Sequence, residues 1–165
     1  SYNTYIFNDT VRANFQLACP QVTEQAIWTA LAQVRLDDFI RQAGGLDKVI
    51  SEDGANISGG QKQRLALAIA LAADRDIYLF DEATSNIDVD SEGVIMDNVA
   101  KLAEEKTVIL ISHRLANVVD AGRIYVLDGG AVAQSGTHGE LMERGGVYAR
   151  MYRAQRELEE VDVHG

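Results

Sequence analysis

Two short apolar runs constrain the fold of this chain more than any other feature. Residues 77–80 read IYLF and residues 107–112 read TVILIS. Continuous apolar runs of this length predict strands that are buried on both faces, as in a parallel sheet. The segment between them, VDSEGVIMDNVAKLAEE (residues 89–105), is typical of a helical crossover. The sequence therefore predicts a right-handed βαβ unit.

The part of the chain before this unit is predicted to be helical. Residues 23–34 place Ile27, Leu31 and Val34 on one helical face, with Thr23 as N-cap. Residues 36–43 form a second short helix that stops at two glycines. Near the N-terminus, Asp9 is expected to cap a short helix that starts at Thr10.

The part that follows the unit is predicted to be a hairpin and then helix. The segments 124–127 and 131–134 flank Gly129 and Gly130, a pair typical of a tight β-turn. Residues 139–160 are predicted to be mostly helical, and the spacing of Thr137 and Glu140 fits a capping box at their start.

Charge and composition exclude several classes of function. The 165 residues carry a net charge of −10, which disfavours direct binding to nucleic acid. The single cysteine, Cys19, cannot form an internal disulfide and fits a reducing compartment. The longest apolar run, residues 65–73, is far shorter than the ~20 residues that cross a bilayer. We expect one soluble domain, and a membrane partner remains open.

The segment ISGGQKQR (residues 57–64) has the pattern of an anion-binding helix start. Ser58 and Gln61 have the spacing of a capping box, and an apolar helical run follows them. The free N–H groups and the positive dipole end of a helix favour a phosphate there, and glycines let it approach the backbone. Taken alone, Ser-Gly-Gly could equally be the capped start of a core helix.

Acidic and imidazole side chains follow the two predicted strands. Asp81 and Glu82 directly follow IYLF, at the sheet edge where α/β proteins bind ligands. An aspartate there can hold Mg²⁺, and the adjacent glutamate can orient or deprotonate a water. His113 follows the second strand and could donate to a phosphate oxygen. The alternatives are a solvated loop for the two acids and a structural role for the histidine.

In this order, these motifs resemble the ATP-binding domain of ABC transporters. The segment ISGGQ (57–61) resembles the signature loop LSGGQ, and IYLFDE (77–82) resembles the Walker B strand. SNID (85–88) resembles the D-loop, and His113 the switch histidine. SEDGA (51–55) and the segment from Val126 to Tyr152 resemble the exporter type of this family.

The resemblance implies an α/β fold: part of a RecA-like P-loop NTPase with its parallel sheet, plus the helical ABC subdomain, a C-terminal β-hairpin and a helix. Residues 1–75 would form the helical subdomain. Residues 76–165 would form the C-terminal half of the ATPase core.

The resemblance also implies roles for single residues. ABC ATPase domains pair head to tail, and the signature loop of one domain contacts ATP held by the other. By resemblance, Ser58, Gly59, Gly60 and Gln61 would bind the nucleotide of the partner domain, and Asp88 would cross the dimer interface. Asp81 would serve Mg²⁺, Glu82 would be the general base, and His113 would steady the γ-phosphate. Residues 5–15 and 51–55 would face transmembrane domains, which would place the chain at the cytoplasmic face of the membrane.

The P-loop of this family is absent from the sequence. The motif G-x-x-x-x-G-K-[ST] requires a lysine after a glycine, and none of the four lysines (Lys48, Lys62, Lys101 and Lys106) follows one. We therefore expect the chain to represent the C-terminal two-thirds of an ATPase domain, and to be inactive on its own.

Two alternatives remain open. The chain could be a non-catalytic module that lends its signature loop to a complete ATPase. It could also belong to a soluble ABC ATPase that acts outside transport, although its acidic charge and the segment 51–55 favour an exporter. The sequence upstream of Ser1 would separate a truncated domain from a natural short form.

Overall fold

The structure, a computed structural model, describes residues 6–51, 56–84 and 87–162. It consists of two compact units, residues 1–109 and 110–165, and each has its own hydrophobic core. The units are described separately. The two units are defined by contacts within each of them. The predicted division into a helical subdomain (1–75) and an ATPase core (76–165) is a separate statement, and it stays a prediction.

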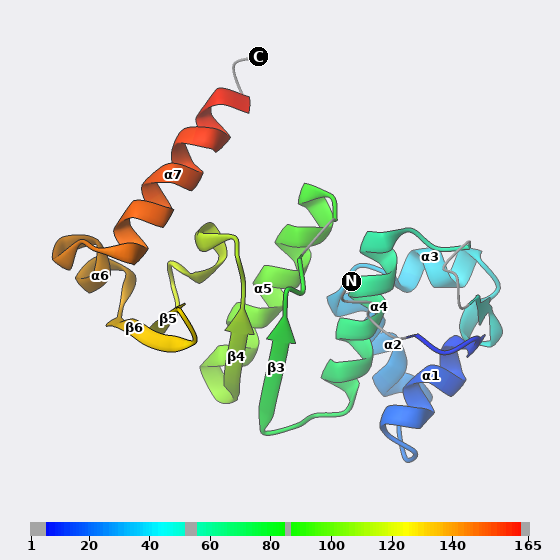
Figure 1. Ribbon diagram of the computed structural model, residues 1–165. Helices are drawn as coiled ribbons and strands as arrows, with labels where there is room; N and C mark the ends of the chain where they lie inside the picture. Colours follow the sequence, from blue (N-terminus) through cyan, green and yellow to red (C-terminus); the bar gives the residue numbers. More distant parts are fainter. Residues whose placement is uncertain (1–5, 52–55, 85–86, 163–165) are drawn as a thin grey trace. The chain divides into compact units, whose positions relative to one another are not determined.

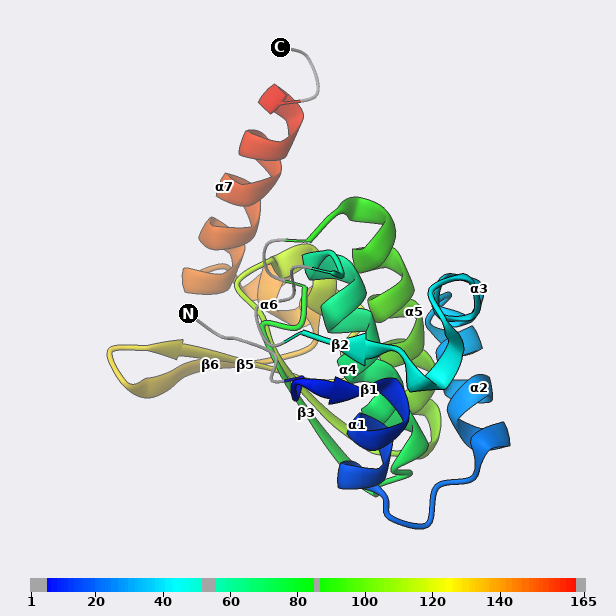
Figure 2. The same cartoon turned by 90° about the vertical axis from the view of Figure 1, so that its right-hand side faces the viewer.

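The first unit opens with short elements packed around one another: β1 (Asp9–Thr10), α1 (Val11–Ala18), α2 (Glu24–Gln33), α3 (Asp37–Gln42), η1 (Gly45–Asp47) and β2 (Val49–Ile50). The strands β1 and β2 pair antiparallel beside α1 (Figure 2). The N-cap of α2 is Thr23, as predicted. The predicted cap of α1 is wrong by one residue. Thr10 accepts the capping bond, because the Asp9 carboxylate instead accepts from the Thr10 N–H.

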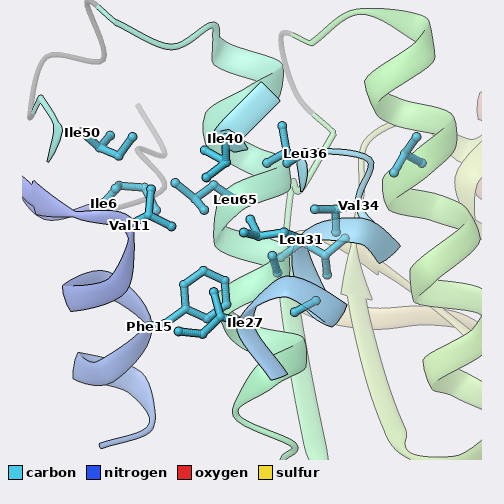
Figure 3. Packing of buried hydrophobic residues seen from close by; sticks show 14 of the residues in the cluster. Ile6, Val11, Phe15, Ile27, Leu31, Val34, Leu36, Ile40, Ile50 and Leu65 are labelled. Carbon is cyan, nitrogen blue, oxygen red and sulfur yellow. The ribbon is translucent and has the colours of Figure 1, made fainter. Parts of the chain in front are cut away.

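The central helix of this unit is α4 (Gly59–Ala72), which packs against both α2 and α5 (Val89–Glu105). Figure 3 shows the core around it, where Phe15 of α1, Ile27 and Leu31 of α2, and Leu65 of α4 are fully buried. Burying four large apolar side chains contributes about 1.5–3 kcal/mol each. The helix that begins at the candidate phosphate loop is therefore held firmly by its flanks.

The predicted βαβ unit is present. The strands β3 (Ile77–Asp81) and β4 (Thr107–Ile111) pair with each other, run in the same direction and are joined by α5 (Figure 1). The prediction that both faces of these strands are buried is wrong for both. In β4, Ile109 is 51% and Ile111 49% exposed. One face of β3 is buried and the other is not. Tyr78 is buried and Phe80 packs against the helical core, whereas Ile77 is 64% and Leu79 65% exposed. The helices cover one face of the strand, and no described residue of this unit covers the other.

The second unit contains η2 (Leu115–Val118), β5 (Ile124–Asp128), β6 (Ala131–Gly136), α6 (His138–Arg144) and α7 (Val147–Asp162). The hairpin of β5 and β6 is confirmed, and its turn residues Gly129 and Gly130 both have positive φ, as a type I′ turn requires. The capping box of Thr137 and Glu140 is confirmed as well. The hydrophobic core of the second unit contains Leu115, Ile124, Val126, Leu141 and Tyr148.

Candidate functional site

The start of α4 has the predicted capping box. The Ser58 hydroxyl accepts from the N–H of Gln61 at 3.2 Å, and Oε1 of Gln61 accepts from the N–H of Ser58 at 2.8 Å. The amides of Gly59 and Gly60 are among those that a helix leaves without an intrahelical acceptor. Ser58 and Gly59 are exposed. Gly60 is buried. The helix start thus presents the exposed Gly59 amide and the Ser58 hydroxyl at its positive end, an arrangement suited to an anion.

The start of α5 lies directly against the start of α4. Asp88 is the N-cap of α5, and its carboxylate accepts from the N–H of Ser91 at 2.8 Å. A Cβ atom built on Gly60 would be 2.6 Å from Oδ2 of Asp88 and 2.5 Å from Oγ of Ser91. The structure therefore brings Asp88, predicted to cross the dimer interface, next to the segment predicted to bind the nucleotide of a partner domain: Ser58, Gly59, Gly60 and Gln61.

The electrostatics of this pair of helix starts favour an ionised carboxylate. The pKa of Asp88 is lowered, first by the hydrogen bond from the Ser91 backbone and then by the Ser91 side chain; the positive charge of Arg64 makes a smaller contribution. Asp88 is exposed, so its charge is available to a second chain.

The two acids lie at the end of β3. Asp81 is the last residue of the strand and is exposed, while Glu82 is partly buried. The Glu82 backbone has φ 49°, a left-handed conformation that costs energy in a residue other than glycine. Strain of this kind is held in place by its surroundings, and Thr84, two residues on, is buried.

A hollow of about 260 Å³ opens beside Asp81. It is lined mainly by apolar side chains of α4 and of the end of β3, among them Ala66, Ala70 and Phe80. No cluster of three metal-ligating side chains occurs among the described residues. Asp81 therefore fits Mg²⁺ only as one ligand among others. That is the usual pattern, since Mg²⁺ takes one or two carboxylates and completes its shell with phosphate and water.

His113 belongs to the second unit and follows β4 after Ser112. Its side chain is exposed, and its backbone carbonyl accepts from Nε2 of Gln155 on α7. Asp81 and Glu82 lie in the first unit, so each group is placed within its own unit. Gln155 was not identified from the sequence, because no motif includes it.

The segment predicted to face transmembrane domains is held by a buried asparagine that the sequence did not single out. Asn14, 3% exposed, accepts from the N–H of Phe7 at 2.8 Å and donates to the carbonyls of Phe7 and Thr10. A single buried polar residue carries no periodic pattern. Tyr5 lies outside the described residues.

The second predicted interface segment, residues 51–55, is described only at Ser51. Asn56, which follows it, accepts from the N–H and hydroxyl of Ser51 and donates to the carbonyl of Val49. These bonds join Asn56 to the end of β2. Ser85 and Asn86 of the predicted D-loop also lie outside the described residues.

Comparison with known proteins defines the class of this chain. The family model for ABC transporters matches residues 3–85, about half of the chain. The chain therefore belongs to the ABC transporter family. Its fold is that of part of an ABC ATP-binding domain, as predicted: over 92% of the chain it superposes on a bacterial Atm1-family ABC exporter with ATP bound, with a TM-score of 0.83 and 36% identity, covering 27% of that protein.

Two curated relatives place it more narrowly among exporter-type members. An uncharacterized ABC transporter ATP-binding protein of Haemophilus influenzae is 48% identical over 98% of this chain, which covers 29% of that protein. An ATP-dependent lipid A-core flippase of Vibrio vulnificus is 41% identical over 94% of the chain, which covers 27% of it. The chain thus spans less than a third of the length of these relatives. Within the described residues, no helix has both the length and the apolar character to cross a bilayer.

Proposed function

We propose that this chain is part of the ATPase domain of an ABC exporter, in which ATP binding and hydrolysis at a head-to-tail dimer interface drive transport. The observation that carries the proposal is the contact between the two helix starts. The anion-suited start of α4 and the exposed carboxylate of Asp88 lie side by side, so one surface could meet both the nucleotide and the chain of a second ATPase domain.

Each site residue has a role in this proposal. Ser58, with the N–H groups of Gly59 and Gly60, binds the phosphates of ATP held by the partner domain. The side-chain oxygen of Gln61 is engaged in the capping box, so Gln61 contributes its Nε2 donor group on the ribose side. Asp88 contacts the partner domain directly.

Hydrolysis is assigned to residues at the strand ends. Asp81 would hold Mg²⁺, which when bound would neutralise charge on the phosphoryl group. Glu82 accepts a proton from the attacking water. His113 donates a hydrogen bond to the γ-phosphate. The transmembrane domains would contact residues 5–15 and 51–55, at the cytoplasmic face of the membrane.

The test of this assignment is Glu82→Gln in the full-length protein. Gln is isosteric but cannot take the proton, so ATP binding should persist while kcat falls by roughly a hundredfold or more. Fluorescent nucleotide binding and phosphate release measure the two effects. Undiminished hydrolysis would remove Glu82 from its role.

A second experiment concerns the chain alone. Because it has no P-loop lysine, the 165-residue chain should neither bind ATP tightly nor hydrolyse it. Turnover at the rate of a complete ATPase domain would contradict the proposed division of the site. A complete ATPase domain whose own signature serine is replaced, if rescued by adding this chain, would favour the non-catalytic module instead.

A further inference from the structure

A side chain of the C-terminal helix α7 forms two hydrogen bonds with the backbone of the loop that follows β4. The amide of Gln155 on α7 uses both its ends: Nε2 donates to the carbonyl of His113 at 2.5 Å, and Oε1 accepts from the N–H of Leu115 at 2.9 Å. One planar group thus bonds the backbone on both sides of Arg114. Within the same loop, the Ser112 hydroxyl bonds both the N–H and the carbonyl of Arg114 at 3.0 Å.

The helix that carries Gln155 is itself fixed. Tyr148, seven residues or about two turns earlier on α7, is 1% exposed. Its hydroxyl lies 2.8 Å from Nδ1 of His138, and its N–H donates to Oε1 of Gln134 at 3.0 Å. Leu115 belongs to the same core as Tyr148. The packing and hydrogen bonds of Tyr148 therefore hold α7, and with it Gln155, in place beside the loop.

The two hydrogen bonds of Gln155 are important because one of them holds the backbone of His113. The His113 side chain is exposed, and the backbone that Gln155 bonds carries its Cα atom. A group that must meet a phosphate oxygen needs its position fixed within about 0.5 Å, and hydrogen bonds behind it supply that precision. We propose that Gln155 is a positioning residue that fixes the backbone of His113 for contact with the γ-phosphate. The inference rests on the role of His113 in the proposed function.

The test compares variants of the full-length protein. Gln155→Ala removes both hydrogen bonds. Gln155→Glu keeps an acceptor for Leu115 but sets a carboxylate oxygen against the His113 carbonyl. Arg153→Ala, an exposed position two residues earlier on α7, is the matched control. We expect both Gln155 variants to lower kcat for ATP hydrolysis roughly three- to tenfold, as loss of one or two hydrogen bonds implies. KM for MgATP should change by less than about twofold, since the other contacts remain.

A double-variant cycle separates positioning from general stability. In a His113→Ala background, Gln155→Ala should cause no further loss of kcat, because the group it positions is gone. The same fold loss in both backgrounds would show that Gln155 only supports the fold, and would overturn the proposal. Unchanged kcat in both Gln155 variants would overturn it as well.

Hydrogen exchange gives a readout that needs no activity. In the nucleotide-free protein, Gln155→Ala should speed amide exchange in the peptide that contains Leu115, while Arg153→Ala should not. Unaltered exchange in that peptide would show that the hydrogen bond from Leu115 to Gln155 does not hold the loop, and would overturn the proposal. If the wild-type protein hydrolyses ATP but His113→Ala has no effect, the positioning role fails and the proposed ATPase function stands. If the wild-type protein does not hydrolyse ATP, the proposed function fails, and the positioning role fails with it.

Discussion

Gly60 lies so close to Asp88 that a side chain at residue 60 would collide with the cap of the neighbouring helix. The nearest Asp88 oxygen would be 2.6 Å from a Cβ there, well inside van der Waals contact. The φ angle of Gly60 is not positive, so it is packing that requires glycine. The second glycine of the signature segment thus serves contact between α4 and α5 in addition to any approach by phosphate.

Gly60→Ala should therefore destabilise the protein by about 1–3 kcal/mol, the usual cost of overpacking. The matched control is Gly59→Ala, because no atom lies within 4 Å of a Cβ at that position. Alanine there should leave stability unchanged or raise it by up to about 1 kcal/mol. Urea unfolding measures both, and equal effects of the two changes would contradict the packing argument.

Asp88 should make stability depend on acid pH. Its folded-state pKa is lowered below the unfolded value, which is near 3.9. Its contribution is therefore fully present above the unfolded pKa and is lost as pH falls from there through the folded pKa. Asp88→Asn keeps an N-cap but does not titrate. The loss of unfolding free energy between pH 5 and pH 3, measured by urea unfolding, should therefore become shallower in this variant, and an unchanged slope would contradict the prediction.

The positive φ angle of Glu82 predicts that glycine is more stable than alanine at this position, the reverse of the order within a helix. At φ 49°, glycine is favoured over alanine by roughly 1 kcal/mol, so Glu82→Gly should be more stable than Glu82→Ala. Both changes remove the same side-chain contacts. At Lys101, exposed within α5, the order should reverse, with Lys101→Gly less stable than Lys101→Ala by about 1 kcal/mol. The same order at both sites would show that the Glu82 conformation carries no strain.

Asn14 should matter far more than its neighbours on α1. Asn14→Ala leaves the N–H and carbonyl of Phe7 without their side-chain partner, at an expected cost of about 1–3 kcal/mol. Gln16→Ala, at an exposed position of the same helix, should stay within about 0.5 kcal/mol. Thermal or urea unfolding compares the two. A mild effect of Asn14→Ala would mean that water replaces its bonds.

Local chemistry explains which features could be predicted from the sequence. The caps at Thr23, Ser58 and Thr137 were correct, because an N-cap side chain bonds the backbone N–H only three residues further on. The paired glycines of the hairpin turn were correct for the same kind of reason. The cap of α1 was misplaced, because Asp9 and Thr10 both have capping side chains and tertiary context decides between them.

The features that could not be predicted depend on distant contacts. Gln155 meets its loop across 42 positions of the chain, and Gly60 meets Asp88 across 28. Neither contact leaves a trace in periodicity or spacing. The apolar residues of β3 were correctly predicted to form a strand, but an apolar run does not reveal whether a neighbouring element covers both faces.

The exposed face of β3 gives this chain an apolar surface through which two molecules can associate. Water ordered around Ile77 and Leu79 is released when two molecules meet through that strand, so warming and sulfate salts both promote the contact. Such a contact leaves the helical core behind the strand intact. Precipitates of this chain are therefore expected to hold folded molecules that redissolve on cooling and dilution.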